Sequence, residues 1–177
     1  DRAAMNELGA HPLYREFLDA IYRHVPNDSW LCDHNRAIPD NLPPDRSILL
    51  GKVTHEVRNV LTTVNPDLVL TCAAVGNHID HKLTRAAVLH AATRTEASIL
   101  LWEDLPYAVG RPSETTQHST RPITAEAWER KWRAISCYAT QVRILWPAGT
   151  DWPDQLLTHA HARGGRCPAE ALFSPCP

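Results

Sequence analysis

Two histidines and an aspartate stand close together near the middle of the chain, at His78, Asp80 and His81. An imidazole can bind a metal or transfer a proton, and a nearby carboxylate can orient it. If one histidine binds the metal, the other transfers a proton and the aspartate orients one of them, the cluster supplies one ligand, whereas a catalytic zinc usually has about three protein ligands. The cluster is therefore a candidate for part of an active site. The alternative is a solvated helix start at which Asp80 acts only as the N-cap.

The segments on either side predict how this cluster is positioned. Residues 67–73 are short and rich in leucine and valine, as a buried parallel strand is, and residues 98–102 form a second such run. Apolar residues at helical spacing predict a helix over residues 82–94, and hence a β-α-β unit. Ligands of such sheets bind at the carboxyl ends of the strands. We therefore expect the cluster to share one rim with residues 103–107.

Helical spacing also appears in segments bounded by glycine or proline elsewhere in the chain. These segments are residues 1–8, 13–22, 45–64 and 124–140. Asp19, in the second of them, and Arg23, directly after it, lie four residues apart and are expected to form a surface pair. Residues 27–44 and 111–121 lack such spacing and predict loops.

The composition indicates a single domain over residues 1–177, with 44% hydrophobic residues to form a core. The 18 basic and 20 acidic residues are well mixed, which argues against a nucleic-acid partner. No apolar run approaches the roughly 18 residues of a membrane span, and the first residues lack the apolar stretch of a signal peptide. We therefore expect a cytoplasmic protein.

The cysteines do not form a metal motif. Their number is five and no Cys-x-x-Cys pair occurs, which argues against a zinc ribbon and predicts free thiols. Cys72 lies on a predicted strand and Cys137 on a predicted helix face. Both are expected to be small buried hydrophobic residues.

Several motifs occur in one order between residues 67 and 173. They are Asp67-Leu68-Val69-Leu70, Gly76-Asn77-His78-Ile79-Asp80-His81, Arg85-Ala86-Ala87, Glu103-Asp104-Leu105-Pro106-Tyr107-Ala108, the helix from Lys131 to Gln141, and Glu170-Ala171-Leu172-Phe173. In this order they resemble the zinc-dependent N-acetylglucosaminyl deacetylases of the PIG-L/LmbE family. Within that family, the chain resembles the branch that acts on glycopeptide antibiotics of the teicoplanin type.

The resemblance implies an α/β fold, a Rossmann-like three-layer sandwich with a mostly parallel sheet. It also implies Zn²⁺-dependent hydrolysis of the N-acetyl or N-acyl amide of a glucosamine-type sugar, on a glycoconjugate such as a glycopeptide antibiotic precursor. In that reaction His81 would be a zinc ligand, and His78 would stabilise the oxyanion or protonate the leaving amine. Asp80 would orient an imidazole and raise the pKa of His78, which must be protonated to act as an acid.

Three further residues are candidate contacts to the acylated amino-sugar substrate. Asp104 and Tyr107 lie on the predicted rim, where their polar groups can bind sugar hydroxyls. Trp30 lies in the long predicted loop and can stack on a sugar or a large aromatic ligand. The alternative for the rim segment is a rigid loop, since Pro106 alone explains its shape.

The chain departs from the family pattern in one respect. The family's His-x-Asp-Asp element, which supplies two zinc ligands and the general base, does not occur in this sequence. Ala10-His11-Pro12 is followed by Leu13 and Tyr14 in place of aspartates. We therefore expect the N-terminal strand region to be missing, and a companion N-terminal fragment to supply the remaining ligands.

Two alternative functions remain open at this stage. The chain can be a catalytically inert carbohydrate-binding or regulatory remnant of the same fold, which predicts sugar binding without acetate release. It can also be a metallophosphoesterase that uses the same histidines.

Overall fold

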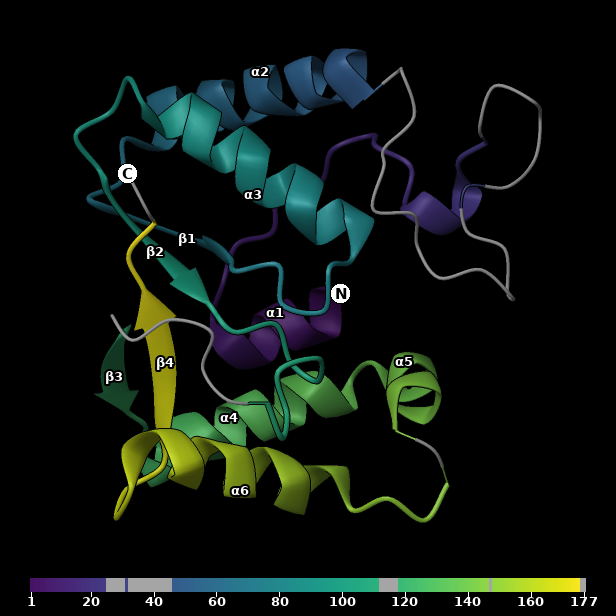
Figure 1. The fold of residues 1–177 in the computed structure, drawn as a ribbon, viewed down its shortest axis with the longest axis vertical. Helices are drawn as coiled ribbons and strands as arrows, with labels where there is room; N and C mark the ends of the chain where they lie inside the picture. The colour runs from purple at the N-terminus through teal and green to yellow at the C-terminus, as the bar shows by residue number, and fades with distance from the viewer. Residues whose placement is uncertain (25–30, 32–45, 112–117, 147, 176–177) are drawn as a thin grey trace. The chain divides into compact units, whose positions relative to one another are not determined.

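The computed structural model of the protein describes residues 1–24, 31, 46–111, 118–146 and 148–175. The chain divides into two compact units, each described here by itself (Figure 1). The first unit comprises residues 1–16, 109–113 and 119–171. The second comprises residues 17–108, 114–118 and 172–177.

The second unit contains the predicted β-α-β arrangement. Strands β1 (Leu68–Cys72) and β2 (Ser98–Trp102) are parallel, and helix α3 (Ile79–Ala92) connects them (Figure 1). Cys72 lies opposite Trp102 in the register, so the carboxyl ends of the two strands are level. Helix α3 begins three residues earlier than the apolar spacing predicts, which places Asp80 and His81 in its first turn.

The sheet is mixed, and the expectation of a mostly parallel sheet is wrong. In the second unit, β2 also pairs with the end of β4 (Ala169–Phe173), and this pairing is antiparallel, with Leu101 opposite Phe173. The α/β class is confirmed, whereas the direction of β4 differs. Local hydrophobic patterns report that a segment is a strand, but they carry no information on the direction of a partner some 70 residues away.

Helix α2 (Arg46–Val64) packs on α3 and closes the core of this unit. Asn65 takes a left-handed conformation with φ 46° before Pro66, and this ends α2 at the predicted place. The core cluster joins α2, α3 and the two parallel strands. Its members are Leu61, Ala91 and Ala92, with Val57, Val69 and Ile99 packed against them.

Two further local predictions fail. Residues 13–19 form no helix, and the predicted helix is reduced to the 3-10 turn η1 (Ala20–Tyr22). Asp19 is the N-cap of η1, and its carboxylate accepts the backbone N–H of Ile21. Strand β1 is not fully buried, because the side chains of Leu68 and Leu70 remain 47% and 46% exposed. An apolar run therefore identified the strand but not the degree to which its faces are covered.

The first unit consists mainly of helices. They are α1 (Arg2–Leu8), α4 (Ala125–Ser136), α5 (Ala139–Leu145) and α6 (Trp152–Gly164). Helix α1 packs against α4, where the Arg133 guanidinium donates to Glu7 at 2.7 Å. Beyond α4, the Tyr138 hydroxyl donates to the Asp1 carboxylate at 2.6 Å. Helix α1 ends at Gly9, which has φ 67°, as its C-cap.

Three predictions in this region need correction. The predicted helix over residues 124–140 is divided, since α4 ends at Ser136 and α5 begins at Ala139. The predicted loop over residues 111–121 contains the start of β3 (His118–Pro122), which lies beside β4. Cys137 caps the end of α4 and is exposed rather than buried.

Among the described residues, no helix is long and apolar enough to cross a membrane.

Two motif residues far apart in the sequence meet in the first unit. The Lys131 ammonium on α4 pairs with the Glu170 carboxylate on β4, 39 residues later. Both residues belong to the downstream motifs singled out in the sequence. Their ion pair ties the middle of α4 to the start of β4.

Candidate active site

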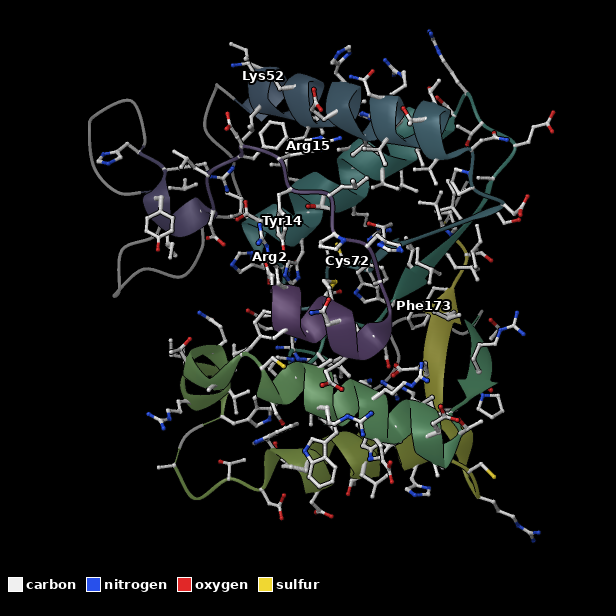
Figure 2. The ribbon with its side chains drawn as sticks, turned by 180° about the vertical axis from the view of Figure 1, so that it is seen from behind. Arg2, Tyr14, Arg15, Lys52, Cys72 and Phe173 are labelled. Atoms are coloured by element: carbon white, nitrogen blue, oxygen red, sulfur yellow. The ribbon has the colours of Figure 1, made fainter. Side chains whose placement is uncertain are left out.

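The candidate site is built at the carboxyl ends of β1 and β2. The backbone N–H of Ala73 donates to the Trp102 carbonyl at 2.8 Å, which extends the parallel pairing by one residue. Cys72, labelled in Figure 2, is the last residue of β1 and is buried. The segments that follow the two strands therefore leave the sheet at the same edge. The predicted shared rim is confirmed by the contacts between these segments.

A strained turn carries the chain from β1 to α3. Ala74, Gly76 and Asn77 all have positive φ angles, of 61°, 83° and 61°. The turn packs closely on Tyr107, since a Cβ at Gly76 would lie 2.8 Å from the Tyr107 Cβ. Only glycine fits this position without displacing the aromatic side chain. Such strain is typical of functional turns, where surrounding contacts hold the backbone in place.

His78 is the N-cap of α3, so the alternative in which Asp80 caps the helix is wrong. Its Nδ1 accepts the backbone N–H of Asp80 at 3.2 Å. The Nδ1 atom therefore presents a lone pair, and a neutral ring carries its proton on Nε2. The Asp80 backbone N–H thus holds the His78 ring, while the orientation of an imidazole by the Asp80 carboxylate stays a prediction.

The expectation that His78 has a raised pKa is wrong. Burial lowers its pKa most, and the neighbouring His81 lowers it further. The Asp80 carboxylate acts in the predicted, raising direction, but its effect is smaller than that of burial. The structure thus favours the neutral ring with its N–H at Nε2.

His81 lies beside His78, with the two ring centroids 4.9 Å apart. Its Nδ1 is 2.7 Å from Oδ1 of Asp104. The other oxygen of Asp104 accepts the backbone N–H of Val75 at 2.9 Å. Asp104 is only 4% exposed, so it faces the turn and the imidazole rather than the solvent.

The contact between His81 and Asp104 is close but not linear. Neither the His81 Nδ1 nor the Asp104 Oδ1 makes a hydrogen bond of regular geometry, although both atoms are buried. The short separation is the more informative observation.

The Asp80 carboxylate has partners outside the motif. Its Oδ2 accepts the backbone N–H of Ala20 at 2.8 Å, and its Oδ1 pairs with the Arg23 guanidinium. The predicted surface pair of Asp19 and Arg23 is therefore wrong, because Asp19 caps η1 and Arg23 reaches α3. No local signal identifies Arg23, which lies 57 residues before its partner.

Tyr107 is the third ring of the site, beside the imidazoles of His78 and His81. Its ring centroid lies 5.7 Å from that of His81, edge to face, and 6.4 Å from that of His78. Burial raises the pKa of Tyr107, and the Asp104 carboxylate raises it further, so the hydroxyl stays protonated. The remaining predicted sugar contact, Trp30, lies outside the described residues.

Part of a metal centre fits this arrangement. Because the Nδ1 of His81 faces Asp104, its Nε2 is the nitrogen that can bind a metal. In the portions of the chain that the structure describes, no group of three or more histidine, cysteine or acidic side chains is placed to hold an ion.

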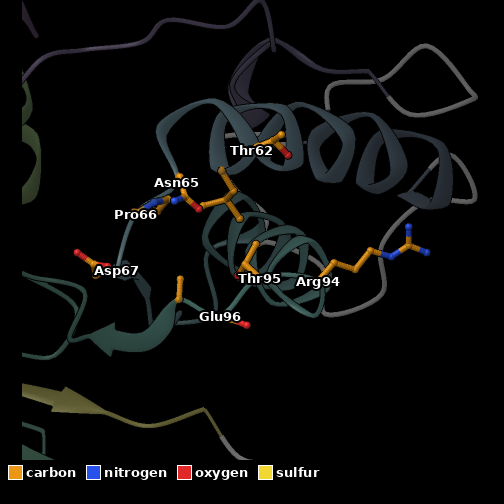
Figure 3. A pocket seen from close by; sticks show the side chains of 9 residues that line it. Thr62, Asn65, Pro66, Asp67, Arg94, Thr95 and Glu96 are labelled. Carbon is orange, nitrogen blue, oxygen red and sulfur yellow. The ribbon is translucent and has the colours of Figure 1, made fainter.

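The second unit also has a cavity of about 520 Å³ away from these groups (Figure 3). Its lining comes from the connections that lead into β1 and β2, at their amino ends. These residues are Leu61, Thr62, Asn65, Pro66, Asp67, Arg94, Thr95, Glu96 and Ala97. None of the predicted site residues lines this cavity, so it is not the candidate active site.

Comparison with known proteins decides the family. No protein-family model matches the chain. It is 29% identical over 125 residues to 2'-N-acetylparomamine deacetylase of Streptomyces fradiae, covering 70% of this chain and 45% of that protein. The zinc-inhibited form of teicoplanin deacetylase Orf2 matches with 30% identity and a TM-score of 0.87, covering 97% of this chain and 70% of that one. The chain belongs to the same family as the teicoplanin deacetylase.

A further family member has the same fold. The A40926 pseudoaglycone deacetylase Dbv21 matches with 28% identity and a TM-score of 0.81, over 98% of this chain and 66% of Dbv21. The chain thus spans less than half of the paromamine deacetylase and about two thirds of the two solved deacetylases. These relatives lend no support to the companion fragment expected from the sequence.

Proposed function

We propose that this deacetylase-family chain hydrolyses the N-acetyl or N-acyl amide of a glucosamine-type sugar on an antibiotic precursor. The observation that carries the proposal is the pair of imidazoles, His78 and His81, 4.9 Å apart at the carboxyl end of β1. The relatives support the class of substrate, since they are deacetylases of 2'-N-acetylparomamine, teicoplanin and the A40926 pseudoaglycone.

The site residues contact different parts of the acylated sugar. The Nε2–H of His78 donates to the carbonyl oxygen, on which negative charge develops when the amide is attacked. Tyr107 lies beside both rings and offers a protonated hydroxyl to the sugar. The Asp80 backbone N–H holds His78 in its orientation throughout.

A zinc ion, when bound, supplies a Lewis acid for the same carbonyl. Of the described residues, His81 would hold it through Nε2, while Asp104 supports the opposite side of the ring. One related structure is a zinc-inhibited deacetylase, which supports metal use in this family.

The test is acetate release from two substrates, a teicoplanin-type glycopeptide with an N-acylglucosamine and 2'-N-acetylparomamine, each with zinc added. Mass spectrometry follows loss of the acyl group. His78→Gln and His81→Gln should each lower the rate at least about 100-fold, the range typical for loss of an acid-base or electrostatic group. His90→Gln, an exposed residue on the same helix, should leave the rate unchanged. Full activity of His81→Gln would refute the proposal.

The second candidate is an inert carbohydrate-binding or regulatory protein of this fold. It is favoured by the lack of a three-residue metal-binding group among the residues that the structure describes. It predicts that titration calorimetry detects binding of the acylated glycopeptide, with no acetate released at any zinc concentration. Acetate release that depends on His78 would exclude it.

A further inference from the structure

Asp104 is a buried carboxylate with two separate tasks in the site. Its side chain is 2% exposed. One oxygen accepts the Val75 N–H at 2.9 Å and so holds the turn after β1. The other oxygen lies 2.7 Å from the Nδ1 of His81 and has no second partner among the described residues.

The proximity of these two atoms restricts the protonation of the His81 ring. A ring with a lone pair on Nδ1 would hold that lone pair 2.7 Å from a carboxylate oxygen in a buried setting, which is repulsive. A ring with its proton on Nδ1 offers the N–H that this oxygen needs. The carboxylate therefore selects the tautomer with the proton on Nδ1 and the lone pair on Nε2.

His78 is restricted in the opposite sense. Its Nδ1 accepts the Asp80 backbone N–H, a donor that cannot turn away while α3 remains folded. A neutral His78 therefore carries its proton on Nε2. The two neighbouring rings then present unlike groups at Nε2, an N–H on His78 and a lone pair on His81.

We propose that Asp104 is a positioning residue that keeps neutral His81 in the Nδ1–H tautomer, opposite to that of His78. This proposal rests on the proposed function. Amide hydrolysis needs a hydrogen-bond donor at the carbonyl oxygen, which the Nε2–H of His78 offers. It also needs an electrophile held nearby, which the Nε2 lone pair of His81 can bind. Asp104 acts here through His81, and its role as a substrate contact stays a prediction.

The test is nitrogen-15 NMR of the metal-free full chain with labelled histidine, recorded at mildly alkaline pH. The correlation patterns of each ring distinguish Nδ1–H from Nε2–H. His78→Gln and His81→Gln assign the two rings by the signals that disappear. The wild type should show His81 as Nδ1–H and His78 as Nε2–H.

Asp104→Asn is the decisive variant. Its amide oxygen can still accept the Val75 N–H, while its NH₂ group faces His81 and should switch that ring to Nε2–H. Asp80→Asn is the matched control, because it removes a nearby carboxylate that pairs with Arg23 and should leave the His81 tautomer unchanged. Circular dichroism checks that both variants are folded.

The outcomes separate the proposals. An Nε2–H signal for His81 in the wild type, or an unchanged His81 signal in Asp104→Asn, would overturn the assignment to Asp104. If Asp104→Asn does not fold, the wild-type spectrum alone decides between the tautomers. The expected tautomers in a chain that releases no acetate would keep this assignment and reject the proposed function.

Discussion

Arg23 and Asp80 form an ion pair that ties the start of α3 to the segment around η1. The side chains are 14% and 25% exposed, so the pair is largely shielded from water. The same carboxylate accepts the Ala20 N–H at 2.8 Å. A residue that the sequence marks as catalytic thus also fastens two distant segments of the second unit.

Removal of this charge should destabilise the protein. Asp80→Asn leaves Arg23 without its anionic partner, and we expect a loss of about 2 kcal/mol in the free energy of unfolding. Urea denaturation followed by circular dichroism measures the change. The paired variant Arg23→Met with Asp80→Asn should recover part of this loss, because no charge is then left unpaired.

Glu126→Gln is the matched control for this experiment. Glu126 pairs with Arg130 at 2.9 Å on the exposed face of α4, and an exposed pair of this kind contributes below about 0.5 kcal/mol. Equal losses for Asp80→Asn and Glu126→Gln would show that the Arg23 pair contributes no more than a surface pair.

Gly76→Ala should disturb the turn beneath Tyr107. The new Cβ would meet the Tyr107 Cβ at 2.8 Å, and alanine is also strained at φ 83°. We expect a loss of about 3 kcal/mol, made of about 1 for the backbone and the rest for the clash. Gly110→Ala is the control, since Gly110 has φ 72° with nothing within 4 Å of an added Cβ. A loss in Gly76→Ala no larger than in Gly110→Ala would rule out the predicted clash.

Ile79 anchors the histidine pair from beneath. It lies between His78 and Asp80 but is only 1% exposed, so its side chain is part of the core. Ile79→Ala should lower the free energy of unfolding by about 3 kcal/mol, the cost of a cavity of this size. Leu68→Ala, at a position that is 47% exposed, should cost below about 1 kcal/mol. Thermal denaturation of the two variants compares them, and a similar fall in both midpoints would contradict the assignment of Ile79 to the core.

Cys72 should react with iodoacetamide more slowly than the exposed thiols. Burial raises its pKa most, with a smaller contribution from the Asp104 carboxylate, and the thiolate is the reactive form. Because its pKa is raised, Cys72 forms the thiolate only at higher pH than an ordinary thiol. Its alkylation rate is therefore low at neutral pH and increases only at higher pH. Cys137 and Cys167 are exposed and should be modified first. Mass spectrometry of the alkylated peptides resolves each site, and early modification of Cys72 in the folded protein would contradict the prediction.

Several parts of the site followed from local sequence. The apolar runs located β1 and β2, and the spacing between them located α3, so the rim that holds His78 and His81 was predictable. Residue types at this rim indicated the class of chemistry. Each of these features depends on residues that are neighbours in the chain, where hydrophobic period and turn composition carry the information.

The sequence by itself therefore determined the β-α-β unit, the position of the imidazole pair and the resemblance to the deacetylases. Only the tertiary structure decided that Asp104 faces His81 rather than the solvent, that Arg23 pairs with Asp80, and that β4 runs antiparallel to β2. These contacts join residues separated by between 23 and about 70 positions, and a local pattern does not encode them. They are set by the packing of whole elements, which decides the burial and the partner of each side chain.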